Sequence, residues 1–126
     1  MTFDIGVARR LVAAFGAHDT AAYFRCFADD ATFVFHTTAQ PIRSLSDYEQ
    51  LWYGWERDGF RVLSCESTDQ FVQLIGEDVA IFTHRVRTVV RLDGAEQTLD
   101  ERETIVFHQR DGQWPAVHEH LSGAPE

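Results

Sequence analysis

The first sixty residues carry apolar side chains at the spacing of amphipathic helices. Val7 and Leu11 belong to one such face and predict a helix near the N-terminus. Asp19 is placed to cap a second, short helix that carries Phe24 and Phe27. The pattern therefore predicts a pair of helices at the start of the chain.

A third helix is predicted after residue 46. Residues 46–49, Ser-Asp-Tyr-Glu, have the pattern of a capping box. Tyr48, Trp52 and Trp55 then fall on one face, and Asp58-Gly59 is typical of a helix end. Aromatic residues at this spacing favour core packing, and Trp52 is also a candidate ligand contact.

The remaining pattern has the two-residue period of strands. Alternation from Ala31 to Thr37 predicts the first strand. From Phe60 onward the period stays at two, interrupted by turn signals at Gly76-Glu77, Asp93-Gly94 and Asp111-Gly112. Helices followed by a four-strand meander predict one α+β domain over residues 1–126, with the helices on one face of a curved sheet.

The turn signals predict which side chains lie opposite one another. Two-residue loops at Asp93-Gly94 and Asp111-Gly112 would place His84 opposite Glu103, and Glu103 opposite His120. A similar loop at Gly76-Glu77 would add Asp69 opposite His84, whereas a bulge in the long strand 60–75 would move Asp69 to the other face. The covered face is predicted to hold this row with Ala80, Phe82, Val86, Val90, Leu99, Glu101, Ile105, Phe107, Trp114, Ala116, His118 and Ser122. The opposite face, a solvent or subunit-contact surface, is predicted to hold Arg85, Arg87, Arg91, Asp100, Arg102, His108, Arg110 and Glu119.

A row of carboxylates and imidazoles on a covered face has three interpretations. Neighbouring groups whose pKa values are pushed apart suit proton transfer on a bound small molecule. The same row would also serve as a satisfied polar network without chemistry. A metal site formed by His118, His120 and Glu103 is the least favoured, because strand neighbours on a flat face rarely converge tetrahedrally. We expect no metal and no cofactor.

Composition and charge narrow the function further. The chain has 11 basic and 20 acidic residues and a net charge of −9, which disfavours nucleic acid and anionic membrane surfaces as partners. Every basic residue is an arginine, so Schiff-base chemistry through a lysine is excluded. Cys26 and Cys65 show no metal or disulfide spacing, and there is no long apolar run, so we expect a cytoplasmic protein.

The C-terminal sequence resembles a known family. Residues 103–114 follow the pattern E-T-x-V-x-H-x-R-D-G-x-W, and residues 117–125 follow V-H-x-H-x-S-G-A-P. This sequence is similar to the end of the calcium/calmodulin-dependent protein kinase II association domain, in the nuclear transport factor 2-like, SnoaL-like superfamily. Over residues 1–100 the resemblance is one of element order.

The resemblance implies a cone of three helices on a strongly curved sheet, with a deep pocket and a homodimer as the basic unit. Small members include polyketide cyclases, ketosteroid isomerase-like enzymes and epoxide hydrolases. These enzymes mostly use an aspartate or histidine with a tyrosine or second acid, which Asp69, His84 and Tyr23 would supply. In the kinase family, arginines at two positions hold a carboxylate. At these positions this sequence has Ile105 and either Val86 or Arg87. The motif itself carries over Glu103, Trp114, His118, His120 and Ser122.

We therefore expect a small-molecule-binding protein, either a homodimer or a higher homo-oligomer, that acts on a small apolar ligand as an isomerase, cyclase or hydrolase. The alternative is a non-catalytic oligomerisation module in which the polar row only stiffens the sheet. The candidate catalytic residues are His84, Glu103, His120 and Asp69. The candidate ligand contacts are Tyr23, His36, Trp52, Trp114 and His118, of which Tyr23 and His36 are placed to reach the mouth of the concave sheet.

Overall fold

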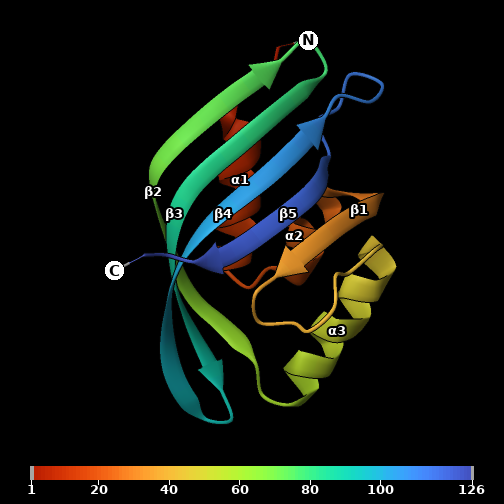
Figure 1. Cartoon of the computed structure of the whole chain (residues 1–126). Coiled ribbons are helices and arrows are strands. Elements are labelled where there is room, and N and C mark those ends of the chain that lie inside the picture. Colours follow the sequence, from red (N-terminus) through yellow and green to blue (C-terminus); the bar gives the residue numbers. More distant parts are fainter. Residues whose placement is uncertain (1, 126) are drawn as a thin grey trace.

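The computed structural model describes residues 2–125, and over this range three helices pack against one five-stranded sheet (Figure 1). The helices are α1 (Ile5–Gly16), α2 (Thr20–Arg25) and α3 (Leu45–Arg57). The strands are β1 (Phe27–Phe35), β2 (Arg61–Ile75), β3 (Val79–Leu92), β4 (Ala95–His108) and β5 (Ala116–Gly123).

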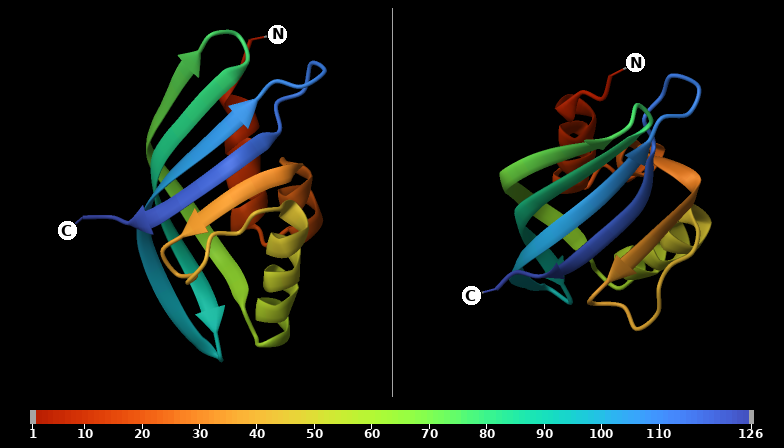
Figure 2. Two further views of the ribbon diagram at one scale, coloured as in Figure 1. Left: turned by 45° about the vertical axis from the view of Figure 1, so that its right-hand side comes forward. Right: turned by 45° about the horizontal axis from the view of Figure 1, so that its top comes forward.

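The strands lie in the order β1-β5-β4-β3-β2, with β1 parallel to β5 and every other neighbouring pair antiparallel. The sheet curves strongly without closing, and the helices cover its concave side (Figure 2). On this concave side α1 packs against the edge strand β2, whereas α3 packs against β1 at the opposite edge of the sheet. The predicted α+β class, with helices on a curved and mainly antiparallel sheet, is confirmed.

Two of the predicted local signals differ from the structure by a few residues. Asp19 caps α2 as predicted, but the cap of α3 is Ser44 rather than Ser46, since the Ser44 side chain accepts from the Asp47 N–H at 3.1 Å. Phe27 lies in β1 rather than in the short helix. It is held there because it pairs with Ala116, whose N–H donates to the Cys26 carbonyl at 2.8 Å.

The pairing of β3 with β4 follows the predicted register along its whole length. His84 lies opposite Glu103, and the two-residue turn has positive φ at Asp93 (50°) and Gly94 (78°), as the tight hairpin requires. His84 and Glu103, the central pair of the predicted row, therefore lie opposite each other as the sequence predicts.

The pairing of β4 with β5 departs from the prediction by one residue. Phe107 pairs with Ala116 as expected, but Val106 pairs with His118, so Val117 is an extra residue in β5. Because side chains alternate along a strand, this bulge turns Glu119 and Leu121 to the covered face and removes His118 and His120 from it. The predicted contact of Glu103 with His120 is wrong.

The pairing of β2 with β3 also contains a bulge. Thr68 pairs with Arg85 and Phe71 with Thr83, so Asp69 lies in the irregular segment, with φ of 54°. The first hairpin also has a three-residue loop, since Ile75 pairs with Val79. Asp69 is exposed and does not face His84, so the bulge considered from the sequence is the arrangement found.

Burial on the concave face predicts a contrast between two phenylalanines on neighbouring strands. Phe82 on β3 is fully buried, whereas Phe71 on β2 is 62% exposed. We expect Phe82→Ala to lower the free energy of unfolding by about 3–5 kcal/mol, because the truncation leaves a cavity in the core. Phe71→Ala should change it by less than about 0.5 kcal/mol. Urea denaturation of both variants measures the difference, and equal losses would contradict this account of the core.

Candidate functional site

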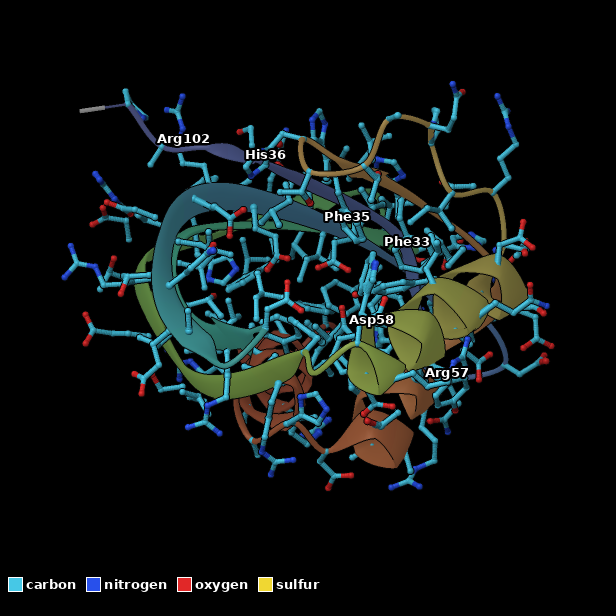
Figure 3. All side chains as sticks on the ribbon, turned by 90° about the horizontal axis from the view of Figure 1, so that it is seen from below. Phe33, Phe35, His36, Arg57, Asp58 and Arg102 are labelled. Carbon is cyan, nitrogen blue, oxygen red and sulfur yellow. The ribbon has the colours of Figure 1, made fainter. Side chains whose placement is uncertain are left out.

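A cavity of about 120 Å³ lies between the concave face of the sheet and the helices. Seen from below, the sheet, α1 and α3 surround the interior side chains, and His36 lies on the rim where the chain leaves β1 (Figure 3). Most of the cavity wall is apolar. Its aromatic part consists of Phe15, Tyr23, Phe35, Tyr48, Trp52, Trp55 and Phe60.

Three glutamates provide the acidic part of the wall. Glu101 and Glu103 alternate onto the inner face of β4, and Glu119 reaches the same face from β5 because of the bulge at Val117. All three are at least nine-tenths buried. Burying several carboxyl groups in an apolar wall is costly unless protons or hydrogen bonds compensate for their charge.

Glu103 and Glu119 compensate for each other. Their side chains are hydrogen-bonded, and burial together with the charge of Glu103 holds the pKa of Glu119 well above its usual range. Burial also raises the pKa of Glu103. Two adjacent buried carboxyl groups cannot both ionise easily, so the pair favours the state with one shared proton, and the stronger rise of the Glu119 pKa favours Glu119 as its carrier.

Two tyrosines extend the pair on the Glu119 side. The Tyr23 hydroxyl donates to Glu119 Oε1 at 3.2 Å, and the Tyr23 and Tyr48 hydroxyls are 2.9 Å apart. Burial is the main cause that raises the pKa of both phenols well above its usual value. Both tyrosines are therefore neutral hydrogen-bond donors at the cavity wall.

His84 extends the pair on the other side. Its Nε2 lies 2.7 Å from Glu103 Oε1, and its Nδ1 lies 2.6 Å from the Ser67 hydroxyl, which in turn accepts from Gln70. Because burial lowers the pKa of His84 to about 4, the ring is neutral, with Nε2–H donating to Glu103 and Nδ1 accepting from Ser67. Glu103 thus receives donors from both sides and is the ionised member of the pair.

Glu101 stands apart from this network at the rim of the cavity. Its Oε2 lies 2.5 Å from His36 Nε2. The His36 side chain is 39% exposed and that of Glu101 only 4%, so this contact lies between the solvent and the cavity wall.

The structure divides the predicted catalytic residues between two sides of the sheet. Glu103 lines the inner cavity, but Asp69 and His120 do not. Asp69 and His120 instead border a depression on the outer side, together with His84 and Glu103. The four predicted residues are therefore neighbours, but the two bulges prevent them from forming one row inside the cone.

The predicted ligand contacts are also divided. Tyr23 and Trp52 line the cavity, and the Trp52 Nε1–H donates to Thr20 at 3.1 Å. His118 is hydrogen-bonded to Thr32 at 2.8 Å, away from the cavity. Trp114 lies in the connection between β4 and β5 and packs against Phe3, with ring centroids 5.2 Å apart. Neither His118 nor Trp114 can contact a ligand in the cavity.

Sequence reasoning missed Glu119, Ser67 and the site roles of Glu101 and Tyr48. Glu101 shares a strand face with Glu103, and Tyr48 shares a helix face with Trp52, so both were available from periodicity. Glu119 was assigned to the outer face, and only Pro115, which lacks an N–H for ladder pairing, signals an irregularity before it.

Among residues 2–125, no three His, Cys, Asp or Glu side chains form a group that could hold a metal ion. The proposed trio of His118, His120 and Glu103 is separated because Glu103 faces the cavity and the histidines face outward. None of the helices in the described range is long and apolar enough to cross a membrane.

Comparison with known proteins identifies the family and the fold of the chain. The model of the SnoaL-like domain family matches residues 6–125. An NTF2-like protein from Rhodospirillum rubrum has a similar structure, with a TM-score of 0.82 and 26% identity, over 98% of this chain and 100% of that one. The association domain of the C. elegans kinase CaMKII superposes with a TM-score of 0.70 and 24% identity, over 94% and 91% of the two chains.

A calcium/calmodulin-dependent protein kinase type II subunit delta from Oryctolagus cuniculus is 43% identical over 56 residues. The match covers 43% of this chain and 10% of the kinase, so the chain corresponds to a small part of that protein. The resemblance inferred from the C-terminal motif is confirmed.

The neutral state of His84 makes a prediction about acid stability. The histidine pKa is lowered from 6.5 to about 4, so below pH 6.5 the unfolded chain binds a proton that the folded chain resists. The free energy of unfolding should therefore fall by roughly 3 kcal/mol through this group as the pH is lowered from 6.5 to 4. Denaturation at both pH values should show a smaller loss in His84→Gln, while His120→Gln, altered at an exposed histidine, should keep the wild-type loss. An unchanged loss in His84→Gln would refute the assignment.

Proposed function

Since the chain belongs to the SnoaL-like domain family, we propose that it binds a small, largely apolar molecule in the cone cavity and acts on it by acid–base catalysis. The observation that carries this proposal is the buried pair of Glu103 and Glu119, which shares one proton beside an apolar cavity. A carboxylate and a carboxylic acid side by side provide a base and an acid at the same pH.

The roles follow from the hydrogen bonds around the pair. Glu119 is the acid, and when the ligand binds, its O–H turns from Glu103 to donate to a carbonyl oxygen of the ligand. Glu103 is the base, and it removes a proton from the carbon next to that carbonyl while the C–H electron pair moves towards the oxygen. Where that carbon also adjoins a carbon–carbon double bond, Glu103 returns the proton to the far end of that bond, the electron pair on oxygen re-forms the carbonyl, and the double bond shifts into conjugation, which completes an isomerisation. His84, Tyr23 and Tyr48 are positioning residues that hold the pair through their donors.

The proposal includes no metal or cofactor, and it places the protein in the cytoplasm as a homodimer or higher homo-oligomer.

Exchange of carbon-bound hydrogen tests this function without knowledge of the natural substrate. Cyclohexanone is an apolar ring ketone of a size that suits the cavity, and NMR in D₂O records the loss of its α-protons. We expect wild-type protein to accelerate this exchange above the buffer rate and Glu103→Gln to lower the acceleration by about 10²-fold or more.

Glu96→Gln is the matched control, because Glu96 lies on the same strand but is exposed. It should retain the wild-type rate. If wild type, Glu103→Gln and buffer alone show equal exchange, the catalytic part of the proposal is refuted.

The second candidate function is a non-catalytic association module. It is favoured by the likeness to solved kinase association domains and by an apolar patch of Phe71, Leu74 and Ile75 exposed on the edge strand β2. In that case the carboxyl pair would only stiffen the sheet. The exchange assay separates the two functions, because an association module would show no exchange dependent on Glu103.

A further inference from the structure

We propose that the largely apolar ligand of the cavity carries one cationic group, as a ring-bearing amine whose ammonium group is bound by Glu101. This inference rests on the proposed function, since it names the class of molecule that the same cavity accepts. It rests on the acidic side chains of the cavity wall, on the carboxylate oxygen Oε1 of Glu101, and on the aromatic lining.

The charge of the wall is acidic without a compensating base inside. Glu101, Glu103 and Glu119 line the cavity, and none of the arginines, the chain's strongly basic residues, is among its lining residues. One shared proton on Glu119 and a neutral His84 leave a negative charge on Glu103. An anionic ligand would meet repulsion in this low-dielectric space, whereas a cation would be attracted.

Glu101 has one carboxylate oxygen available for such a cation. His36 occupies Oε2, and among residues 2–125 the other oxygen, Oε1, has no hydrogen-bond partner. The side chain is only 4% exposed and lines the cavity, so water around the molecule does not fully solvate this oxygen. An ammonium group carries three donors and would satisfy Oε1.

The aromatic lining suits the rest of such a ligand. Trp52, Trp55 and Phe60 form one side of the cavity, with Trp52 and Phe60 centroids 5.3 Å apart in an edge arrangement. Aromatic faces attract ammonium groups, most strongly where water is excluded. The volume of about 120 Å³ is below the roughly 150 Å³ of a cavity that holds benzene, so a single ring fills the cavity and a short amine arm would extend to the rim, where Glu101 lies.

Glu101 is therefore a specificity residue, separate from the acid–base pair. Glu103 has His84 and Glu119 as partners and Glu119 has Tyr23, so neither is as free as Glu101 to receive a new donor. A substitution at Glu101 should alter which ligands bind while the shared proton of the pair persists.

Binding of matched probes tests the inference. Benzylamine, benzyl alcohol, toluene and benzoate share one ring and differ in the charge and hydrogen bonding of the substituent. Trp52 and Trp55 in the wall report binding through tryptophan fluorescence, and calorimetry gives the affinities. For wild type at neutral pH we expect benzylamine to bind on the order of tenfold more tightly than benzyl alcohol or toluene, and benzoate to bind least.

Two variants assign the preference to one carboxylate. Glu101→Gln keeps the shape of the side chain but removes its charge, and it should reduce the preference for benzylamine over toluene to nearly one. Glu96→Gln, an exposed change on the same strand, should retain the wild-type preference. If Glu101→Gln does not fold, as judged by circular dichroism, the comparison of the four probes on wild type still decides the question.

The outcomes distinguish this inference from the proposed function. Toluene and benzyl alcohol binding as tightly as benzylamine, or benzoate binding more tightly, would overturn the amine inference and leave the apolar cavity in place. A preference for benzylamine that persists in Glu101→Gln would overturn the role of Glu101. Failure of all four probes to bind would contradict the binding part of the proposed function itself.

Discussion

The hydrogen bond between the buried carboxyl groups of Glu103 and Glu119 is the interaction on which the interior of this protein depends. Two charges at this position would be strongly destabilising, and two neutral acids would leave no base. Sharing one proton resolves both problems, because the charge of Glu103 is then stabilised by donors from Glu119 and His84. Other polar groups extend this pair, with Tyr23 and Tyr48 next to Glu119 and with Ser67 reached through His84 on the other side.

The curved sheet and the helices make this arrangement possible. Antiparallel strands β4 and β5 bring the two glutamates together, and the helices supply an aromatic wall that limits access of water. Exclusion of water strengthens hydrogen bonds and charges inside the cavity and also shifts the pKa values of its acids. The same burial that would penalise an isolated carboxylate therefore gives this pair its chemical character.

Much of the fold could be predicted from the sequence because its signals are local. The Asp93-Gly94 turn requires positive φ at both residues, and this requirement set the register that places His84 opposite Glu103. Asp19 likewise marked the start of α2 through a single side-chain contact. The α+β class followed from the change of period after residue 60.

The candidate site was predicted only in part because its composition depends on two bulges. The extra residue Val117 exchanges Glu119 for His118 and His120 on the inner face, and the irregularity at Asp69 leaves Ser67 beside His84. A bulge adds one residue and reverses the alternation beyond it, and apart from Pro115 the local sequence does not mark where this happens. The C-terminal motif identified the family correctly, yet its histidines lie outside the cavity.

The protonation state of the pair can be measured most directly by ¹³C NMR of protein labelled at the glutamate carboxyl carbons. If Glu103 and Glu119 share one proton, one carboxyl resonance should keep its protonated shift at neutral pH, and that resonance should be missing from Glu119→Gln. The account would be contradicted if both residues ionised near the ordinary glutamate pKa.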